Sequence, residues 1–244
     1  MTNVVMITAR SGKQQLANKN MRLVAGKPLV SYPIAAGLAA KTIDRVFVTT
    51  NGADLAAFAT GCGAEVIERP QSISGPDSPH YQTIEHGTDY LANLIPDLGI
   101  VVILMGNTAM IDGPTIDACV TRLEGDDSLS GVLTVWQAQD DHPYRALVDG
   151  GDGCLVPAPG PREYKTANRQ AYPPTYYFDH GVFAVRWQFV KDRTGVNPWT
   201  WMGPRTGYVV RQWDCGRDVH DERGLDLAEW WVARTKRLGI TSLE

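Results

Sequence analysis

Residues 8–20 read TARSGKQQLANKN and directly follow the apolar run VVMI at residues 4–7. A β-branched run that ends in a glycine-containing basic loop is typical of a strand leading into an anion-binding turn, because parallel strands of α/β sheets place ligands at their carboxyl ends. The loop supplies the side chains of Arg10, Lys13 and Lys19 and the backbone N–H groups of Ser11 and Gly12. It matches neither G-x-x-x-x-G-K-[ST] nor G-x-G-x-x-G, so the pattern alone also allows a solvated basic loop.

The composition of the 244-residue chain is that of an ordinary globular protein, with 43% hydrophobic residues and a formal net charge of −4. An acidic chain is poorly suited to coat a polyanion, so we expect no nucleic-acid partner and only local phosphate chemistry. No apolar run reaches the roughly 18 residues that span a bilayer, and no basic leader precedes the first strand, so we expect no membrane association and a cytoplasmic location. The cysteines form no C-x-x-C pair and the histidines no H-x-x-x-H spacing, which argues against a disulfide framework or a zinc site.

Apolar runs and helical periodicity alternate along the chain up to residue 136. Strands are predicted at residues 4–7, 45–49, 65–67, 100–104, 131–136, 181–185 and 208–210. Helices are predicted at residues 54–60, 81–94, 114–123 and 222–238, with another opening at Gly26-Lys27-Pro28-Leu29, where Pro28 suits a first turn. This alternation predicts a single α/β domain over residues 1–244 with a doubly wound, mostly parallel sheet. Residues 140–174 are rich in Gly, Pro, Asp and Arg without a helical period, so we expect a β-rich insertion there.

Several motifs occur in the order of one known family. The loop TARSGKQQLANKN is followed by AGKPLVSYPI, RVFVTTNGADLAAFATGCGAEVIERP, DHPYRAL, NRQAYPPTYYFDHG and DVHDERGLDLAE. Together they cover most of the chain, which resembles the acylneuraminate cytidylyltransferases, the CMP-sialic acid synthetases and their CMP-nonulosonate relatives. The resemblance implies a fold like that of nucleotide-diphospho-sugar transferases. It also implies transfer of CMP from CTP to a small sialic-acid-like sugar acid, with release of pyrophosphate and with Mg²⁺ as cofactor.

The resemblance also implies roles for particular residues. Catalytic roles fall on Arg10, Lys19 and Asp218, and Asp218 is also the expected metal ligand. The expected nucleotide-binding residues are Ala9, Arg10, Ser11, Gly12, Lys13, Lys19, Asn20, Arg69 and Ser78. The expected acceptor-binding residues are Arg169, Gln170, Tyr177 and His180. An Arg guanidinium suits the carboxylate of a sugar acid, although Arg69 could instead be an exposed loop cation and Arg169 part of a surface salt bridge. The insertion would be the arm of a homodimer, reaching over the acceptor site of a second copy.

The chain departs from the family pattern around the expected site. Lys13 and Gln14 replace the usual Ser-Lys, Asn51 replaces Asp, Gly106 and Asn107 replace Gln and Pro, and His180 replaces Asn. The second metal-binding acid of the family is replaced by His220, whose imidazole is a poor ligand for Mg²⁺. Asp221 could substitute only with a different local backbone, and His220 could simply be a residue at the start of a helix.

These departures leave several interpretations of function open. The first is CMP transfer to a different acceptor, or transfer from a nucleotide with another base. The second is a nucleotide-binding regulatory protein of the same fold that has lost catalysis. A dinucleotide-dependent oxidoreductase on a similar sheet is the third, but the glycine fingerprint of that class is missing. The first interpretation is favoured because residues of both the phosphate and the acceptor halves are retained: Arg10, Lys19, Asn20, Arg69, Arg169, Gln170 and Asp218.

Overall fold

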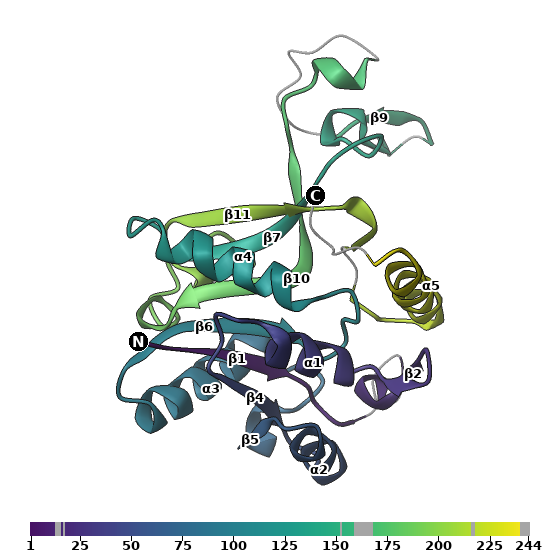
Figure 1. The fold of residues 1–244 in the computed structure, drawn as a ribbon. Coiled ribbons are helices and arrows are strands. Elements are labelled where there is room, and N and C mark those ends of the chain that lie inside the picture. Colours follow the sequence, from purple (N-terminus) through teal and green to yellow (C-terminus); the bar gives the residue numbers. More distant parts are fainter. Residues whose placement is uncertain (13–15, 17, 152, 159–167, 216–217, 240–244) are drawn as a thin grey trace.

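The computed structural model describes residues 1–12, 16, 18–151, 153–158, 168–215 and 218–239. A seven-stranded sheet forms its centre, in the order β11-β7-β10-β6-β1-β4-β5 (Figure 1). The strands are β1 (Thr2–Thr8), β4 (Arg45–Thr50), β5 (Glu65–Glu68), β6 (Leu98–Met105), β7 (Gly131–Gln137), β10 (Tyr176–Arg186) and β11 (Thr206–Arg211). Within this sheet β10 runs antiparallel to both of its neighbours, and the other pairings are parallel. The predicted mostly parallel α/β sheet is confirmed.

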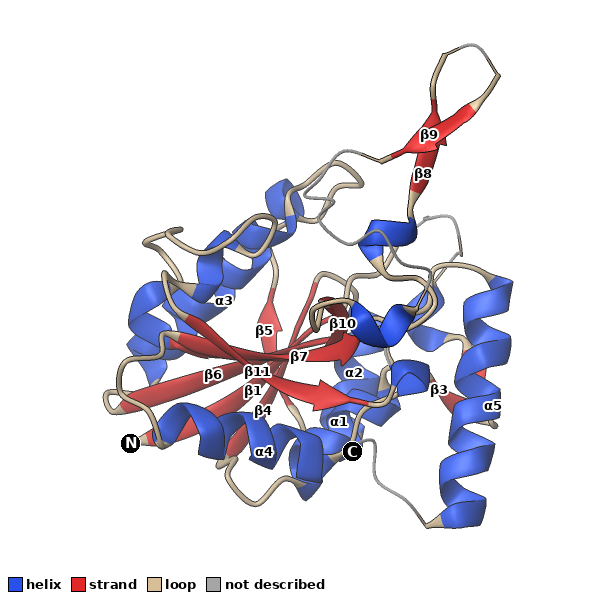
Figure 2. Cartoon of the chain, turned by 90° about the horizontal axis from the view of Figure 1, so that it is seen from above, coloured by secondary structure: helices blue, strands red, loops and turns tan. Residues whose placement is uncertain are grey.

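Helices cover both faces of the sheet. The helices are α1 (Ser31–Ala39), α2 (Ala53–Gly61), α3 (His80–Leu94), α4 (Gly113–Glu124) and α5 (Glu222–Leu238). Along β1, Val5 and Ile7 join the core formed with α1, α2 and α4, whereas Val4 and Met6 join the core formed with α3. Figure 2 shows α3 on one side of the sheet and α4 on the other. Because successive residues of a strand point to opposite faces, a strand covered on both sides is apolar throughout.

The described chain also contains short 3-10 helices. They are η1 (Lys19–Met21), η2 (Gln71–Ile73), η3 (Pro143–Arg145), η4 (Arg169–Ala171), η5 (Trp187–Phe189), η6 (Thr200–Met202) and η7 (Trp213–Cys215). None of the helices in the described part of the chain is both long and apolar enough to cross a membrane.

The stretch Gly26-Lys27-Pro28-Leu29 does not open a helix, so that prediction is wrong. Leu23–Val24 (β2) pairs instead with Lys27–Pro28 (β3), and α1 begins only at Ser31. Ala25 and Gly26 join the two strands with φ angles of 47° and 80°. Two consecutive residues with positive φ form the kind of turn that closes a tight β-hairpin. Pro28 therefore lies in a strand of this hairpin, three residues before the helix.

Strand β10 begins five residues earlier than the predicted strand at residues 181–185, because an irregularity interrupts its pattern. The pairing with β7 is regular at Phe178 and resumes at Phe183, with a register shift between them. His180 lies within this bulge and has a φ of 58°. A bulge breaks the alternation of side chains on which strand prediction depends. The four other helices and the other strands lie within about two residues of the predicted bounds.

The arm, residues 138–175, connects β7 to β10, and its described part projects away from the sheet (Figure 1). Its described part contains a hairpin of β8 (Leu147–Asp149) and β9 (Leu155–Pro157). The two ends of the arm lie side by side, because the N–H of Ala138 donates to the carbonyl oxygen of Thr175 at 2.8 Å. Leu147 and Leu155 on the hairpin are 55% and 70% exposed. The hairpin therefore has little apolar cover from its own chain.

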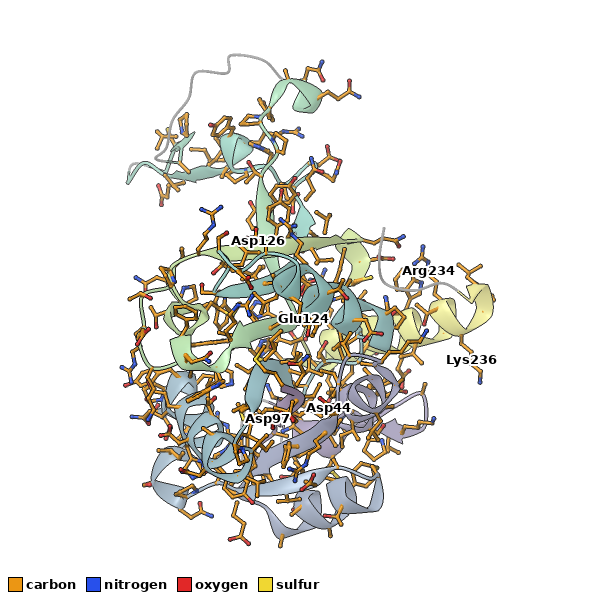
Figure 3. The ribbon with its side chains drawn as sticks, turned by 60° about the vertical axis from the view of Figure 1, so that its left-hand side comes forward. Asp44, Asp97, Glu124, Asp126, Arg234 and Lys236 are labelled. Atoms are coloured by element: carbon orange, nitrogen blue, oxygen red, sulfur yellow. The ribbon has the colours of Figure 1, made fainter. Side chains whose placement is uncertain are left out.

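Helix α5 packs beside the carboxyl ends of the strands. Its Trp231 lies in a third apolar cluster with Val24 and Val219, and the indole Nε1 donates to Cys215 Sγ at 3.4 Å. Arg234, labelled in Figure 3, donates to Asp214 Oδ2 at 2.8 Å. These contacts hold the segment before α5 against the body of the protein.

A buried ion pair lies beneath the bulge of β10. Arg211 Nη1 is 2.9 Å from Asp179 Oδ2, and both side chains are inaccessible to solvent. Asp179 Oδ1 also accepts hydrogen bonds from the hydroxyl of Thr134 and, at 2.8 Å, from the N–H of Gly181. The carboxylate thus joins three adjacent strands at the bulge.

We predict that Asp179→Ala strongly destabilises the protein, because it leaves the Arg211 guanidinium buried without a counter-charge. The expected loss in free energy of unfolding is about 3–5 kcal/mol, measured by urea denaturation. Glu65→Ala is the control, since it breaks an exposed pair in which Arg45 Nη2 lies 2.6 Å from Glu65 Oε2. It should lose less than about 1 kcal/mol. Equal losses in the two variants would contradict the prediction.

Candidate active site

A cavity of about 350 Å³ opens at the carboxyl ends of the parallel strands. It is lined by Thr8, Arg10, Lys19, Asn20, Arg69, Ile73, Ser78, His80, Thr83, Met105, Asn107, Asp218 and His220. These residues come from the ends of β1 and β6, the loops after β1 and β5, the first turn of α3 and the segment before α5. This is the edge where open α/β sheets bind their ligands.

The first loop packs directly on the end of β6. The N–H of Gly106 donates to the carbonyl oxygen of Thr8 at 3.0 Å, and the N–H of Ala9 donates to that of Thr49 at 3.1 Å. A Cβ atom on Gly106 would lie 2.6 Å from the Cβ of Ala9. Glycine at position 106 therefore allows the close contact with Ala9. Glutamine, which is usual at this position in the resembled family, would prevent that contact in this backbone. As a result Asn107 is the first residue after β6 whose side chain lines the cavity.

The described lining of the cavity carries three cations, Arg10, Lys19 and Arg69, and one carboxylate, Asp218. Arg69 is only 7% exposed and its Nη2 donates to the carbonyl oxygen of Thr49 at 2.7 Å. The alternative that Arg69 is an exposed loop cation is therefore wrong. Burial, together with the nearby Arg10, lowers the pKa of Arg69 to about 10. Such a concentration of buried positive charge favours an anionic ligand.

Lys19 is close to both the acid, Asp218, and one of the arginines, Arg10. Burial lowers the pKa of its ammonium group, Asp218 opposes that shift, and Arg10 adds to it. Its Nζ donates to the carbonyl oxygen of Val219 at 3.3 Å. A phosphate in the cavity would stabilise the charged form of this side chain.

Asn20 ties the first loop together and leaves one atom unsatisfied. Its Nδ2 donates to the carbonyl oxygen of Arg10 at 2.9 Å, and the side chain is 3% exposed. Its Oδ1 is buried without a hydrogen-bond partner among the described residues. Buried polar atoms are rarely left unpaired in proteins, so this oxygen is a position where a ligand hydroxyl can donate.

Carboxylates gather at the opposite, amino-terminal edge of the sheet. Asp97 Oδ1 accepts from the hydroxyl of Thr2 at 3.0 Å, and Asp44 Oδ2 accepts from the N–H of Asn3 at 2.8 Å. Figure 3 labels Asp44, Asp97 and Glu124, and Glu124 Oε1 accepts from Asn3 Nδ2 at 2.9 Å. The cationic cavity and these acids therefore lie at different ends of the strands, which directs an anion to the carboxyl edge.

Asp218 is held by its neighbours. Its Oδ2 lies 3.1 Å from Asn107 Nδ2 and 2.8 Å from His220 Nε2. Asp221 cannot substitute as a second acid, because its Oδ1 caps α5 by accepting from the N–H of Gly224 at 2.8 Å. In the described ranges no three His, Cys, Asp or Glu side chains are grouped to hold a metal. One carboxylate beside phosphate oxygens still suits Mg²⁺, which usually keeps several waters and binds through one or two carboxylates.

Of the other expected nucleotide-binding residues that the structure describes, only Ser78 lines the cavity. Ala9 is fully buried beneath it, and Gly12 is exposed. The N–H of Ser11 donates to Asn51 Oδ1 at 3.0 Å, which links the first loop to the end of β4. Lys13 lies outside the described residues.

The expected acceptor-binding residues do not line the cavity within the described part of one chain. Gln170 is exposed on the arm, and the backbone of Arg169 belongs to η4, but the side chain of Arg169 lies outside the described part. Tyr177 stacks on Trp136 with ring centroids 4.7 Å apart, and its hydroxyl donates to the carbonyl oxygen of Asp141 at 3.0 Å. The fourth residue, His180, packs edge-on against Trp199 at 5.5 Å.

Several lining residues are absent from the site predicted from sequence, and two signals in the sequence point to them. Thr8, Met105 and Asn107 lie at or just after strand ends, so the rule that located the first loop applies to them too. His80 and Thr83 are three residues apart at the start of α3 and therefore share one face. His80 Nε2 is 3.0 Å from the hydroxyl of Thr8. Burial and the cations Arg69 and Arg10 lower the pKa of His80 to about 4.

Fold and cavity together define an α/β protein with a cationic cavity at the carboxyl edge of its sheet. A family model described as cytidylyltransferase matches residues 4–142, more than half of the chain. The chain belongs to this cytidylyltransferase family and is a nucleotidyltransferase.

Its relatives lie in two branches of the family. The chain is 27% identical over 210 residues to the 3-deoxy-manno-octulosonate cytidylyltransferase of Chlorobaculum tepidum, covering 81% of this chain and 79% of that one. It is 34% identical over 91 residues to the N-acylneuraminate cytidylyltransferase of Escherichia coli, covering 36% of this chain but only 22% of that one. The motifs thus identify the family correctly, but they do not single out its acylneuraminate branch.

Solved structures share the fold at low sequence identity. A CMP:2-keto-3-deoxy-manno-octonic acid synthetase complexed with CTP superposes with a TM-score of 0.70 at 16% identity, covering 96% of this chain and 99% of that one. The 4-diphosphocytidyl-2C-methyl-D-erythritol synthase of Anaerococcus prevotii gives a TM-score of 0.63 at 12% identity, with the same coverage.

We predict that His80 makes folding stability depend on pH. Its pKa is about 4 in the folded protein and 6.5 ordinarily, so its contribution is complete above pH 6.5 and is lost as the pH falls towards 4. His80→Asn should therefore lose less stability than the wild type between pH 7.5 and pH 5. Urea denaturation at the two pH values, in phosphate-free buffer, measures the difference, and equal losses would contradict the prediction.

Proposed function

We propose that this protein transfers CMP from CTP to a 2-keto sugar acid and releases pyrophosphate. The observation that carries the proposal is the cavity, in which Arg10, Lys19 and Arg69 meet a single carboxylate, Asp218. A triphosphate supplies the negative charge that these cations need. Membership of the cytidylyltransferase family and the names of the relatives support CTP as the donor and a sugar acid as the acceptor.

In the proposed reaction a hydroxyl oxygen of the acid attacks the α-phosphorus of CTP. The bond from that phosphorus to the bridging oxygen breaks, the proton of the attacking hydroxyl passes to solvent water, and pyrophosphate leaves with the negative charge. Little covalent chemistry falls to the protein in such a step, so catalysis rests on positioned charge. Arg10 can hold two phosphate oxygens in its planar fork, whereas Lys19 acts as a compact point charge. The buried Asn20 Oδ1 can accept a hydrogen bond from a ribose hydroxyl.

Mg²⁺ is the proposed cofactor, with Asp218 as its protein ligand. When bound beside the phosphates, the ion neutralises charge on the triphosphate and on the leaving group. The residues present fit this role, because Asp218 lines the same cavity as the three cations. His220 is 64% exposed and contacts the carboxylate, so we assign it no role as a ligand of this hard cation.

The acceptor is proposed to be a 3-deoxy-octulosonate-like acid, with nonulosonic acids as the second choice. Relatives named for 3-deoxy-manno-octulosonate align over most of this chain, whereas the N-acylneuraminate match spans 36% of it. Both kinds of acceptor carry a carboxylate next to the reacting centre. The family assignment alone does not separate them.

We further propose that the arm brings Arg169 and Gln170 to the cavity of a second copy in a homodimer. This is supported by the distance of the arm from the sheet in Figure 1 and by the exposed Leu147 and Leu155, which a partner would cover. Light scattering at working concentration should give the mass of a dimer. The mass of a monomer would contradict the proposal.

One specific observation favours a second function. His220 occupies the position of the second acid of the family, and the backbone around Gly106 excludes the usual glutamine side chain. A nucleotide-binding regulatory protein without catalysis would tolerate both changes. It would bind CTP without releasing pyrophosphate.

We predict pyrophosphate release with Mg²⁺ when the four ribonucleoside triphosphates are each combined with 3-deoxy-manno-octulosonate and a panel of nonulosonic acids. Release specific to CTP and one acid is expected. Binding of CTP without release with any acid would favour the regulatory function instead.

Two lysine variants are compared in this assay, Lys19→Ala as the test and Lys27→Ala as the control. Lys19→Ala should reduce kcat by about 10²–10³-fold, because it removes a charge from the stabilised phosphates. Lys27→Ala, in the exposed part of β3, should retain the wild-type rate. Similar rates for Lys19→Ala and the wild type would remove Lys19 from the catalytic site.

A further inference from the structure

We propose that Asn107 is a positioning residue that sets the orientation of the Asp218 carboxylate for the divalent cation. The inference rests on the proposed function, in which Asp218 is the metal ligand. The resembled acylneuraminate family usually has proline at this position. The role of Asn107 follows from the contacts of its side chain and backbone.

Asn107 connects the end of β6 to the segment that carries Asp218. Its Nδ2 donates to Asp218 Oδ2 at 3.1 Å and to the carbonyl oxygen of Val219 at 2.8 Å. Its own carbonyl oxygen accepts from the N–H of Val219 at 2.8 Å. One hydrogen bond to Asp218 and two to the backbone of Val219 thus fix this segment to a residue that is itself only 6% exposed. Proline at this position could make the backbone contact but neither of the side-chain bonds.

The two oxygens of the Asp218 carboxylate have different contacts. Asn107 Nδ2 and His220 Nε2 both lie within hydrogen-bond distance of Oδ2, at 3.1 Å and 2.8 Å. Oδ1 has no hydrogen-bond partner among the described residues. An oxygen that already accepts two hydrogen bonds is a weaker ligand, so Oδ1 is the oxygen available to a cation. Asn107 therefore selects the ligating oxygen without touching the metal.

Lys19 is linked to the same segment. Its Nζ donates to the carbonyl oxygen of Val219, the atom that also accepts from Asn107 Nδ2. The carbonyl thus joins a cation of the proposed phosphate site to the residue that orients the metal ligand. A shift of this segment would move both groups together.

The test measures binding of Mn²⁺ to the full-length protein with saturating CTP, by electron paramagnetic resonance of the free ion. Asn107→Ala should weaken Mn²⁺ binding by about tenfold or more, the usual effect of removing a hydrogen bond to a metal ligand. It should also lower kcat more than it raises KM for CTP. An affinity within twofold of the wild type would overturn the proposal.

A double-mutant cycle separates positioning from direct contact with the ligand. If Asn107 acts through the carboxylate, Asn107→Ala should change Mn²⁺ affinity less than twofold in an Asp218→Asn background. If the same tenfold loss persists in that background, Asn107 does not act through Asp218 and the proposal fails.

Asn3→Ala is the matched structural control. Asn3 is also a buried asparagine next to β6, but its Oδ1 accepts from the N–H of Ile100 at 3.0 Å, at the opposite edge of the sheet. It should lower stability and leave Mn²⁺ affinity within twofold of the wild type. If Mn²⁺ binding were also weaker in Asn3→Ala, the effect of Asn107→Ala would come from general destabilisation, and the proposal would be overturned. Mn²⁺ binding does not require an acceptor, so a wild-type protein that releases no pyrophosphate would refute the proposed function while leaving this test intact.

Discussion

The contact between Ala9 and Gly106 is the constraint on which the cavity depends. Strands β1 and β6 are parallel neighbours, and the hydrogen bond from Gly106 to Thr8 continues their pairing beyond the last residue of β6. With no side chain at position 106, the first loop lies directly on the strand end. The loop then delivers Arg10 to the same space that Asn107 reaches from β6. The cations and the acid are therefore brought together by the sheet itself.

Positive charge in this cavity works against the stability of the empty protein. Arg69 is buried with Arg10 nearby, and burial disfavours the charged form of Lys19. Removing charge from water is unfavourable unless a partner compensates for it. An anionic ligand would provide that compensation, so binding and stability are coupled at the site. Functional sites commonly retain such destabilising arrangements.

Much of the fold could be predicted because its strands and helices carry strong periodic patterns. The failures have local causes: the paired positive φ angles at Ala25 and Gly26 form a hairpin where a helix was expected, and the bulge at His180 hides half of β10. Two cations of the cavity, Arg10 and Lys19, could be predicted from one loop because they are close in sequence, whereas Arg69 comes from the loop after β5. The position of Asn107 after a strand and the spacing of His80 and Thr83 are visible in the sequence, but their proximity to Asp218 arises only when strand ends and α3 converge. Of the expected acceptor residues, Gln170, Tyr177 and His180 lie on the arm and on β10 and do not line the described part of the cavity.

The root of the arm is a pair of adjacent antiparallel strands. Gln137 pairs with Tyr176, so the chain leaves and re-enters the sheet about one strand spacing apart, or about 4.8 Å. Lengthening a loop between fixed ends has only a small entropic effect, which grows with the logarithm of its length. The arm can therefore be exchanged, extended or shortened during evolution without altering the register of the sheet. Under the proposed function, recognition of the acceptor by the arm can then diverge while the chemistry performed on CTP is conserved.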